Sequence, residues 1–164
     1  MHFSSGINRP PYEANDEFLQ ITSGCSHGSC KFCTFYKDSP FSLSPMEEIE
    51  ADIKELAYSG WGFDRIYLQG ADPFIRKTED LLKIAEMIYH YLPQVKSIGG
   101  YARVDNLKNK TVEQVRQLKD AGYNYFYFGG ESGDDKLLDR MNKGYHADYV
   151  LHECRKMDEV GMPW

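Results

Sequence analysis

The sequence lacks any long apolar run. No stretch of about 18 consecutive apolar residues occurs, so no membrane-spanning helix is expected. The N-terminus also lacks a basic segment followed by an apolar one, so no secretory signal peptide is indicated. We therefore expect a cytoplasmic protein that makes no contact with membranes.

The chain also lacks an excess of basic residues. It has 19 Lys and Arg against 25 Asp and Glu, for a net charge of -6. Binding to a nucleic acid backbone requires clustered Lys and Arg, so this segment is not expected to bind nucleic acid directly. The 12 Tyr and 9 Phe fall mostly in strand-like runs, which favours core positions over a base-stacking surface.

Cysteine is scarce, but its placement is informative. Of the four cysteines, Cys25, Cys30 and Cys33 lie within nine residues, directly after the apolar stretch at 18–21. In a reducing compartment such cysteines favour metal ligation over cross-linking, and nothing else in the chain suggests secretion. Three thiolates this close together predict a metal site.

The number of nearby ligands distinguishes the possible metals. A structural zinc takes four protein ligands, whereas three leave one coordination position free for chemistry. The C-x4-C-x2-C spacing matches plant-type ferredoxins, but these need a fourth thiolate. Cys154 recurs with Val150, Leu151 and Met157 at helical spacing, which predicts a core position for it. A [4Fe-4S] cluster with one bare iron therefore fits best, and zinc completed by His27 is the alternative.

Strand and helix patterns alternate along the chain. We expect strands at 16–22, 64–69, 95–102 and 123–128, the third interrupted by Gly99 and Gly100. Repeated strand-helix units imply right-handed crossovers and a parallel sheet. The expected fold is α/β, a partial TIM-like (βα) barrel in one domain over 1–164, with 1–15 as an N-terminal extension. A fifth strand would begin at 161–164, so the chain is expected to be truncated there.

Helix boundaries follow from capping signals. Ser44 and Pro45 are expected to open one helix, Thr78 to cap the next, and a capping box at 111–114 to start the third. Two more helices are expected at 132–142, ended by Gly144, and at 147–160. The buried stripes are predicted to be 49, 53, 56 and 57 in the first helix and 81, 84, 85 and 88 in the second.

Polar residues follow each expected strand. The cysteines follow the first, Asp72 the second, Arg103 and Asp105 the third, and Glu131 the fourth. In TIM-like barrels the chemistry lies at the carboxyl ends of the strands. The four segments are therefore expected to form one shared site.

The cysteine motif and its surroundings resemble the N-terminal part of a radical S-adenosylmethionine (SAM) enzyme core, from about residue 17 to the end. In that superfamily three cysteines after the first strand hold a [4Fe-4S] cluster, and Phe32 takes the place of an aromatic residue near the adenine. The usual spacing is C-x3-C-x2-C, so this chain carries one extra residue. Gly70, Ala71 and Asp72 stand where an acidic motif takes the amino group of SAM.

The segment from Gly130 to Gly144 is similar to a signature of a branch that includes methylthiotransferases and many cobalamin-linked members. The resemblance implies that Glu131 faces the ribose or carboxylate of SAM, with Ser132 beside it. Arg103 at a strand end would hold the SAM carboxylate. Simpler roles stay open: Asp72 as a turn residue, Glu131 as an exposed helix charge, Ser132 as an N-cap and Arg103 in a surface ion pair.

The resemblance implies an oxygen-sensitive radical SAM enzyme. One electron from a flavodoxin or ferredoxin passes through the cluster and cleaves SAM, and the resulting 5'-deoxyadenosyl radical takes a hydrogen atom from a substrate. No catalytic residue beyond the cofactor site is assigned, because members of the superfamily select substrates largely through later strands and extra domains. Two alternatives stay open: an iron-sulfur electron carrier that binds no SAM, and a zinc-stapled interaction module.

Overall fold

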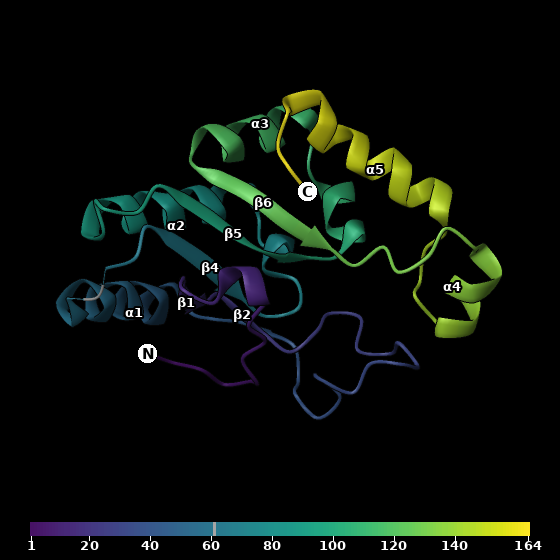
Figure 1. The fold of residues 1–164 in the computed structure, drawn as a ribbon, viewed down its shortest axis with the longest axis horizontal. Helices are drawn as coiled ribbons and strands as arrows, with labels where there is room; N and C mark the ends of the chain where they lie inside the picture. The colour runs from purple at the N-terminus through teal and green to yellow at the C-terminus, as the bar shows by residue number, and fades with distance from the viewer. Residues whose placement is uncertain (61) are drawn as a thin grey trace.

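The computed structural model describes residues 1–60 and 62–164. Its central sheet has four parallel strands in the order β1-β4-β5-β6, and Figure 1 shows them side by side. These strands are β1 (Glu17–Gln20), β4 (Arg65–Gln69), β5 (Ser97–Ala102) and β6 (Tyr123–Phe128). Among the described residues the sheet does not close on itself, so the architecture is a partial TIM-like barrel.

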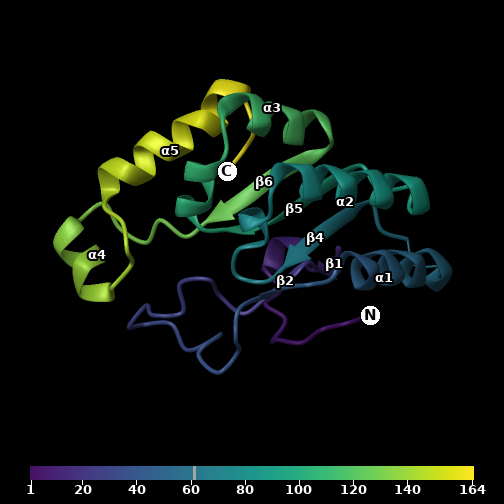
Figure 2. The ribbon, with the colours of Figure 1, turned by 180° about the vertical axis from the view of Figure 1, so that it is seen from behind.

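Four helices cover one face of the sheet. They follow one another around it, α1 against α2, α2 against α3 and α3 against α5, as the view from behind shows (Figure 2). Their bounds are α1 (Met46–Ser59), α2 (Thr78–Tyr91), α3 (Val112–Asp120) and α5 (Ala147–Val160). The short α4 (Asp135–Met141) lies apart from this layer, beyond the end of β6.

Smaller elements complete the fold. The two-residue strands β2 (Thr22–Ser23) and β3 (Ser42–Leu43) pair antiparallel, and residues 24–41 between them form what we call the cysteine loop. Three short 3-10 helices are η1 (Pro11–Glu13), η2 (Pro73–Ile75) and η3 (Val104–Asn109). The β2–β3 pair holds both ends of the cysteine loop at the carboxyl end of β1.

The two faces of the sheet have different chemistry because side chains alternate along each strand. Leu19, Ile66, Leu68 and Ile98 point into the apolar core beneath the helices. The opposite face is aromatic and polar, and residues from the N-terminal segment 1–16 lie across it. Its side chains include Phe18, Gln20, Tyr67, Gln69, Tyr101 and Tyr127.

Hydrogen bonds hold the N-terminal segment on this second face. The Ser4 N–H donates to Gln20 Oε1 at 2.9 Å. The Gln69 carboxamide bonds both backbone groups of Asn8, accepting from its N–H and donating to its carbonyl, each at 3.2 Å. The residues expected to form an extension therefore cover part of the sheet.

Arg65 at the start of β4 explains the glycine in β5. A Cβ on Gly99 would lie 2.0 Å from Arg65 Nη2, so only glycine leaves room for the guanidinium. Arg65 then donates to the carbonyls of Asn124 and Tyr125, at 3.1 and 3.4 Å, where the register of β6 shifts against β5. Gly99, one of the two glycines that interrupt the strand pattern, therefore makes room for a side chain from the neighbouring strand.

Two carboxyl groups lie beside Arg65. Its Nε donates to Glu13 Oε2 at 2.8 Å and lies 3.5 Å from Asp16 Oδ2. Burial, and then the hydrogen bond and charge of Glu13, raise the pKa of Asp16 from 3.8 to about 7. The folded protein thus holds a proton that the unfolded chain releases at lower pH.

This proton makes stability depend on pH. Because the folded-state pKa of Asp16 is raised, its contribution to stability is present near pH 4 and is lost as the pH rises toward 7. We expect the free energy of unfolding to fall by about 2–3 kcal/mol between pH 5 and pH 7.5. Asp16→Asn should remove most of this slope, as measured by urea unfolding at both pH values. An equal slope in the variant would contradict the assignment.

Several sequence predictions of the fold are confirmed. The strand at 123–128 and the helix at 147–160 have the expected bounds. The capping box at Thr111 forms, with Gln114 N donating to Thr111 Oγ1 at 3.2 Å and Gln114 Oε1 accepting from Thr111 N at 2.9 Å. The buried stripe of α2 is as expected, and Cys154 is buried in the core.

Three helix starts were predicted wrongly. The N-cap of α1 is Pro45, that of α2 is Lys77 and that of α4 is Asp134. Ser44, expected to cap α1, instead donates its backbone N–H to the Ile21 carbonyl at 3.1 Å. Ser44 does not cap α1 because contacts with Gln20 and Ile21 hold it, and Asp134 lies closer to α4 than Ser132 and accepts the Lys136 N–H.

Other boundaries also differ from the sequence predictions. The expected first strand at 16–22 is split, because the chain leaves the main sheet after Gln20 and pairs with β3. α4 ends at Asn142 in the left-handed conformation, before Gly144. Ala57 and Leu151, expected in buried stripes, are exposed, whereas Asp52 is buried and bonded to His2.

The chain end runs beside the outer edge of β6. The Phe126 N–H donates to the Pro163 carbonyl at 3.4 Å, and the Trp164 ring packs against Phe128. This is where a fifth strand was expected. No helix among the described residues is long and apolar enough to cross a bilayer.

Candidate cofactor site

The three clustered cysteines line one small cavity. Cys25, Cys30 and Cys33 surround about 30 Å³, together with Tyr36 and other cysteine-loop residues. All three are free thiols and none is fully buried. The turn that carries them begins at Gly24, where a Cβ would lie 2.6 Å from the Ser39 carbonyl, so the two ends of the loop touch.

A larger cavity of about 240 Å³ continues from the cysteines toward the strand ends. The structure brings Phe32, Ala71, Arg103 and Glu131 to its wall, from the cysteine loop and from the segments after β4, β5 and β6. Tyr36, Tyr101 and Tyr127 also line it, as does Asn8. The carboxyl ends of all four parallel strands therefore lead to one site.

Three of the predicted site residues lie outside the cavity wall. Gly70 packs against Thr22, where a Cβ would lie 2.0 Å from Thr22 Oγ1. Asp72 lies fully buried behind Ala71. Ser132 accepts the Asp134 N–H at 3.0 Å and so takes part in the turn before α4.

Asp72 ties the end of β4 to the cysteine loop. Its Oδ2 accepts hydrogen bonds from the backbone N–H, at 3.2 Å, and the hydroxyl of Ser26. Its Oδ1 is buried and has no hydrogen-bond partner among the described residues. Burial raises the pKa of Asp72, opposed by the Ser26 hydrogen bonds and the charge of Arg103. A cation placed against Oδ1 would satisfy this oxygen.

Arg103 is a buried cation at the cavity wall. Its Nε and Nη2 donate to the two carboxylate oxygens of Asp105, each at 3.0 Å. Burial alone would lower the pKa of Arg103, but the Asp105 pair raises it, so the guanidinium stays charged. The predicted ion pair therefore forms, but with a buried guanidinium instead of a surface one, and the same guanidinium lines the cavity, where its contact with a cofactor stays a prediction.

Lys143 is a functional candidate that sequence reasoning missed. Its side chain is 7% exposed, and its ammonium lies 2.9 Å from Glu131 Oε1 and 5.7 Å from the Phe32 ring centroid. Glu131 adopts a φ of 66°, uncommon for a residue other than glycine and often found at functional sites. The available signal was a lysine between Asn142 and Gly144 in the segment that resembles the radical SAM branch.

The cysteine loop fits an iron-sulfur cluster better than a single metal ion. Among the described residues, no group of three or more His, Cys, Asp or Glu side chains converges as one ion requires. A cubane cluster instead takes thiolates around a volume, as the three cysteines are placed here. His27, the expected fourth zinc ligand, directs Nε2 to the Asn142 carbonyl at 2.7 Å and to Ser29. The buried Tyr36 hydroxyl beside the thiols has no partner among the described residues.

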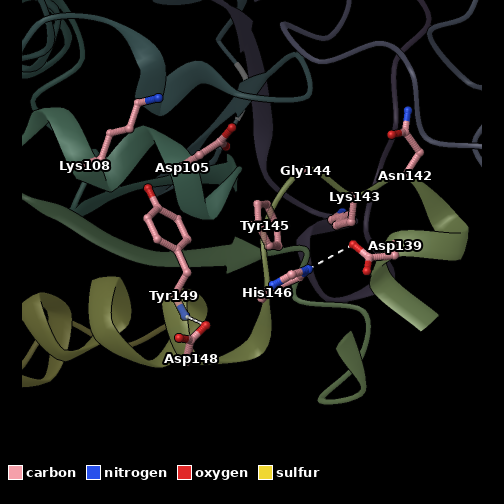
Figure 3. A pocket seen from close by; sticks show the side chains of 10 residues that line it. All are labelled: Asp105, Lys108, Asp139, Asn142, Lys143, Gly144, Tyr145, His146, Asp148 and Tyr149. Atoms are coloured by element: carbon pink, nitrogen blue, oxygen red, sulfur yellow. Dashed lines mark hydrogen bonds and ion pairs between the residues drawn. The ribbon is translucent and has the colours of Figure 1, made fainter. Parts of the chain in front are cut away.

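A separate groove of about 590 Å³ lies between η3 and the α4–α5 turn. Figure 3 shows its polar lining, including the ion pair between His146 Nε2 and Asp139 Oδ1 at 2.9 Å. Asp139 raises the pKa of His146 through this contact. Lys143 lines both this groove and the cysteine cavity, so the two adjoin at that residue.

Comparison with known families decides the chemistry of the site. Residues 19–164 match the model of the radical SAM superfamily. The chain belongs to that superfamily. Its cofactors are a [4Fe-4S] cluster and S-adenosylmethionine, as the cysteine motif indicated. The structure places the free thiols beside a largely apolar cavity whose wall also carries the charged side chains of Arg103, Glu131 and Lys143.

Curated relatives share a quarter of the sequence. The heme chaperone HemW of Bacillus subtilis (strain 168) is 27% identical over 84% of this chain and 37% of its own length. The tRNA-2-methylthio-N(6)-dimethylallyladenosine synthase of Clostridium tetani (strain Massachusetts / E88) is 26% identical over 87% of this chain and 32% of its own. The chain thus spans about a third of the length of these relatives.

Solved structures show the same fold. The cobalamin-dependent radical enzyme OxsB, with aqua-cobalamin and S-adenosylmethionine bound, superposes with a TM-score of 0.72 at 19% identity, over 90% of this chain and 23% of that protein. Methylornithine synthase (PylB) superposes with a TM-score of 0.63 at 19% identity, over 92% of this chain and 44% of that protein. The four-stranded sheet is therefore part of a known radical SAM architecture.

Proposed function

We propose that this chain carries the cofactor site of a radical SAM enzyme, with Cys25, Cys30 and Cys33 as the cluster ligands. One observation carries the proposal: the three free thiols open into a cavity walled by segments from all four strand ends. With both cofactors bound, the site would supply one-electron reduction of SAM, which would break a carbon–sulfur bond to give methionine and a 5'-deoxyadenosyl radical able to take a hydrogen atom from the substrate. A flavodoxin or ferredoxin is the proposed electron donor.

Different residues of the chain would recognise different groups of SAM. Ala71 at the cavity wall would face the SAM amino group, and Asp72, buried next to it with an unpaired Oδ1, would supply the negative charge that attracts this group. Arg103 would attract the carboxylate, since its charge is buried at the cavity wall. Glu131, held by Lys143, would accept hydrogen bonds from the ribose hydroxyls, and the exposed Phe32 ring would pack on the adenine.

Aromatic residues of the cavity wall would limit the access of water to the cofactors. Phe32, Tyr36, Tyr101 and Tyr127 supply most of the apolar wall, and the N-terminal segment adds Asn8 at its edge. Water exclusion strengthens the charge interactions of Asp72 and Arg103 and protects a reactive radical from side reactions. The proposal names no substrate, because the chain spans only about a third of the length of these relatives.

The proposal is tested by SAM binding to the reconstituted protein. After anaerobic reconstitution with iron and sulfide, SAM should perturb the electron paramagnetic resonance spectrum of the reduced cluster, and dithionite should release 5'-deoxyadenosine. Asp72→Ala should weaken SAM binding by about 2–5 kcal/mol, because the ammonium loses a buried charged partner. Iron content is measured in parallel, since Asp72 also holds Ser26.

The matched control is Asp64→Ala. Asp64 precedes the same strand β4 at its opposite end, and its exposed carboxylate pairs with Lys96. This variant should bind SAM like the parent. A reconstituted cluster that SAM does not perturb would instead support an iron-sulfur electron carrier, and a colourless zinc protein would support the interaction module.

A further inference from the structure

The last residue of α4 and the residues that follow it contact the cysteine loop at several points. The Lys31 N–H donates to the Met141 carbonyl at 2.9 Å, and Asn142 Nδ2 donates to the Ser29 carbonyl at 2.8 Å. Ser29 and Lys31 are the two neighbours of Cys30 in the sequence. Residues 141–144, which we call the 141–144 turn, therefore hold the backbone on both sides of this one cysteine.

A third contact joins the same segments. His27 Nε2 donates to the Asn142 carbonyl at 2.7 Å. The His27 ring also lies over Gly144, where a Cβ would be 3.1 Å from the ring. Gly144 has a φ of 88°, so both its backbone conformation and the close ring favour glycine.

The conformation of Asn142 makes these contacts possible. Its φ of 55° and ψ of 50° are left-handed, which ends α4 and turns both its carbonyl and its carboxamide toward the cysteine loop. Asparagine tolerates this conformation better than most residues. Figure 3 shows Asn142 at the end of α4, with Lys143 and Gly144 next to it. The Lys143 ammonium reaches Glu131, so the turn links the cysteine loop to the segment after β6.

We propose that the 141–144 turn fixes the position of Cys30, and that Asn142 is a positioning residue for this cluster ligand. The proposal rests on the proposed function for the identity of the ligand, whereas the contacts themselves belong to the protein without its cofactors. Holding Ser29 and Lys31 restricts the backbone of Cys30 before any iron binds, which lowers the ordering cost of cluster binding. Cys25 and Cys33 lie outside the segment that the turn holds.

The first test uses the chain without its cofactors. Alkylation by N-ethylmaleimide is followed separately at each cysteine by mass spectrometry, with buried Cys154 as the internal reference. Asn142→Gly keeps the left-handed conformation and removes the carboxamide donor. We expect alkylation of Cys30 to become about five times faster, as the loss of one hydrogen bond predicts, with no equal change at Cys33. An unchanged rate at Cys30 would overturn the proposal.

Two further variants separate positioning from a loss of fold. Asn142→Asp keeps the size and backbone preference but cannot donate to Ser29, so it should also speed the alkylation of Cys30. Arg140→Ala is the matched control, because Arg140 is exposed and precedes the turn, and its side chain makes no hydrogen bond or ion pair with the described residues. Its alkylation rates should stay within a factor of two of the parent. An equal rise in Arg140→Ala would show that fraying of α4 explains the effect.

The second test uses the reconstituted protein. Asn142→Gly should lose iron to a chelator several times faster than the parent and shift the reduction potential of the cluster, whereas Arg140→Ala should do neither. If the parent assembles no cluster, the proposed function fails, while faster alkylation of Cys30 still supports the contact with the turn. Iron loss and potential both equal to the parent would overturn the role of Asn142 as a positioning residue.

Discussion

Replacing Cys25, Cys30 or Cys33 by Ala is expected to abolish the iron-sulfur cluster, whereas Cys154→Ala should leave it intact. Each of the three thiols lines the same small cavity, and loss of one leaves a second iron without a protein ligand. Cys154 lies 1% exposed in the core, where burial raises the pKa of its thiol to about 11 and so disfavours the thiolate.

Iron and sulfide content measured after anaerobic reconstitution checks this result. The parent and Cys154→Ala should each hold close to four irons per chain and absorb near 400 nm, and the other three variants should hold almost none. Cys154→Ala serves as the control for the loss of a cysteine, at a modest cost in stability from the small void it leaves. Loss of the cluster in Cys154→Ala would overturn the assignment of three ligands.

Gly70→Ala is expected to be among the most destabilising single changes in the chain, by about 3 kcal/mol or more. Gly70 has a φ of 107°, which residues with a side chain rarely adopt. An added Cβ would lie 2.0 Å from Thr22 Oγ1 and 2.6 Å from the Thr22 carbonyl oxygen. The strain falls where β4 ends against β2, so it should also disturb the start of the cysteine loop.

Urea unfolding of the protein without cofactors measures the effect. Gly133→Ala is the matched control, because its φ lies outside the left-handed region and a Cβ there meets no described atom within 4 Å. Gly133→Ala should change stability by less than about 1 kcal/mol. Adding Thr22→Ala to Gly70→Ala should restore only part of the loss, since the carbonyl oxygen remains. A Gly70→Ala protein as stable as the parent would contradict the close approach.

Local patterns were sufficient for most of the helices and strands. Apolar periodicity located the buried stripe of α2 and the bounds of β6 and α5, because each depends on residues within the element itself. The capping box at Thr111 was predictable for the same reason. The cap expected at Ser44 was wrong because Ser44 is held by contacts with Gln20 and Ile21, and the cap expected at Thr78 was wrong because α2 already includes that residue.

The cofactor site likewise has features that the sequence predicted and contacts that it did not. The cysteine spacing and the order of polar residues after the strands indicated a shared cofactor site, because parallel strands bring their carboxyl ends to one edge. Asp72 illustrates the limit: its place after β4 was predictable, but its hydrogen bonds to Ser26 depend on where the cysteine loop folds back. Lys143 is a second case, since its pairing with Glu131 spans the whole of α4.

The sequence by itself determined the alternating strand-helix order, the core position of Cys154 and the clustering of three thiols after the first strand. These follow from neighbours in the chain and from the side-chain period of each element. Tertiary structure alone decided that Gly99 makes room for Arg65, that the N-terminal segment covers the second face of the sheet, and that the 141–144 turn holds Cys30. The reason is that each such contact joins segments far apart in sequence, whose distance depends on the packed sheet.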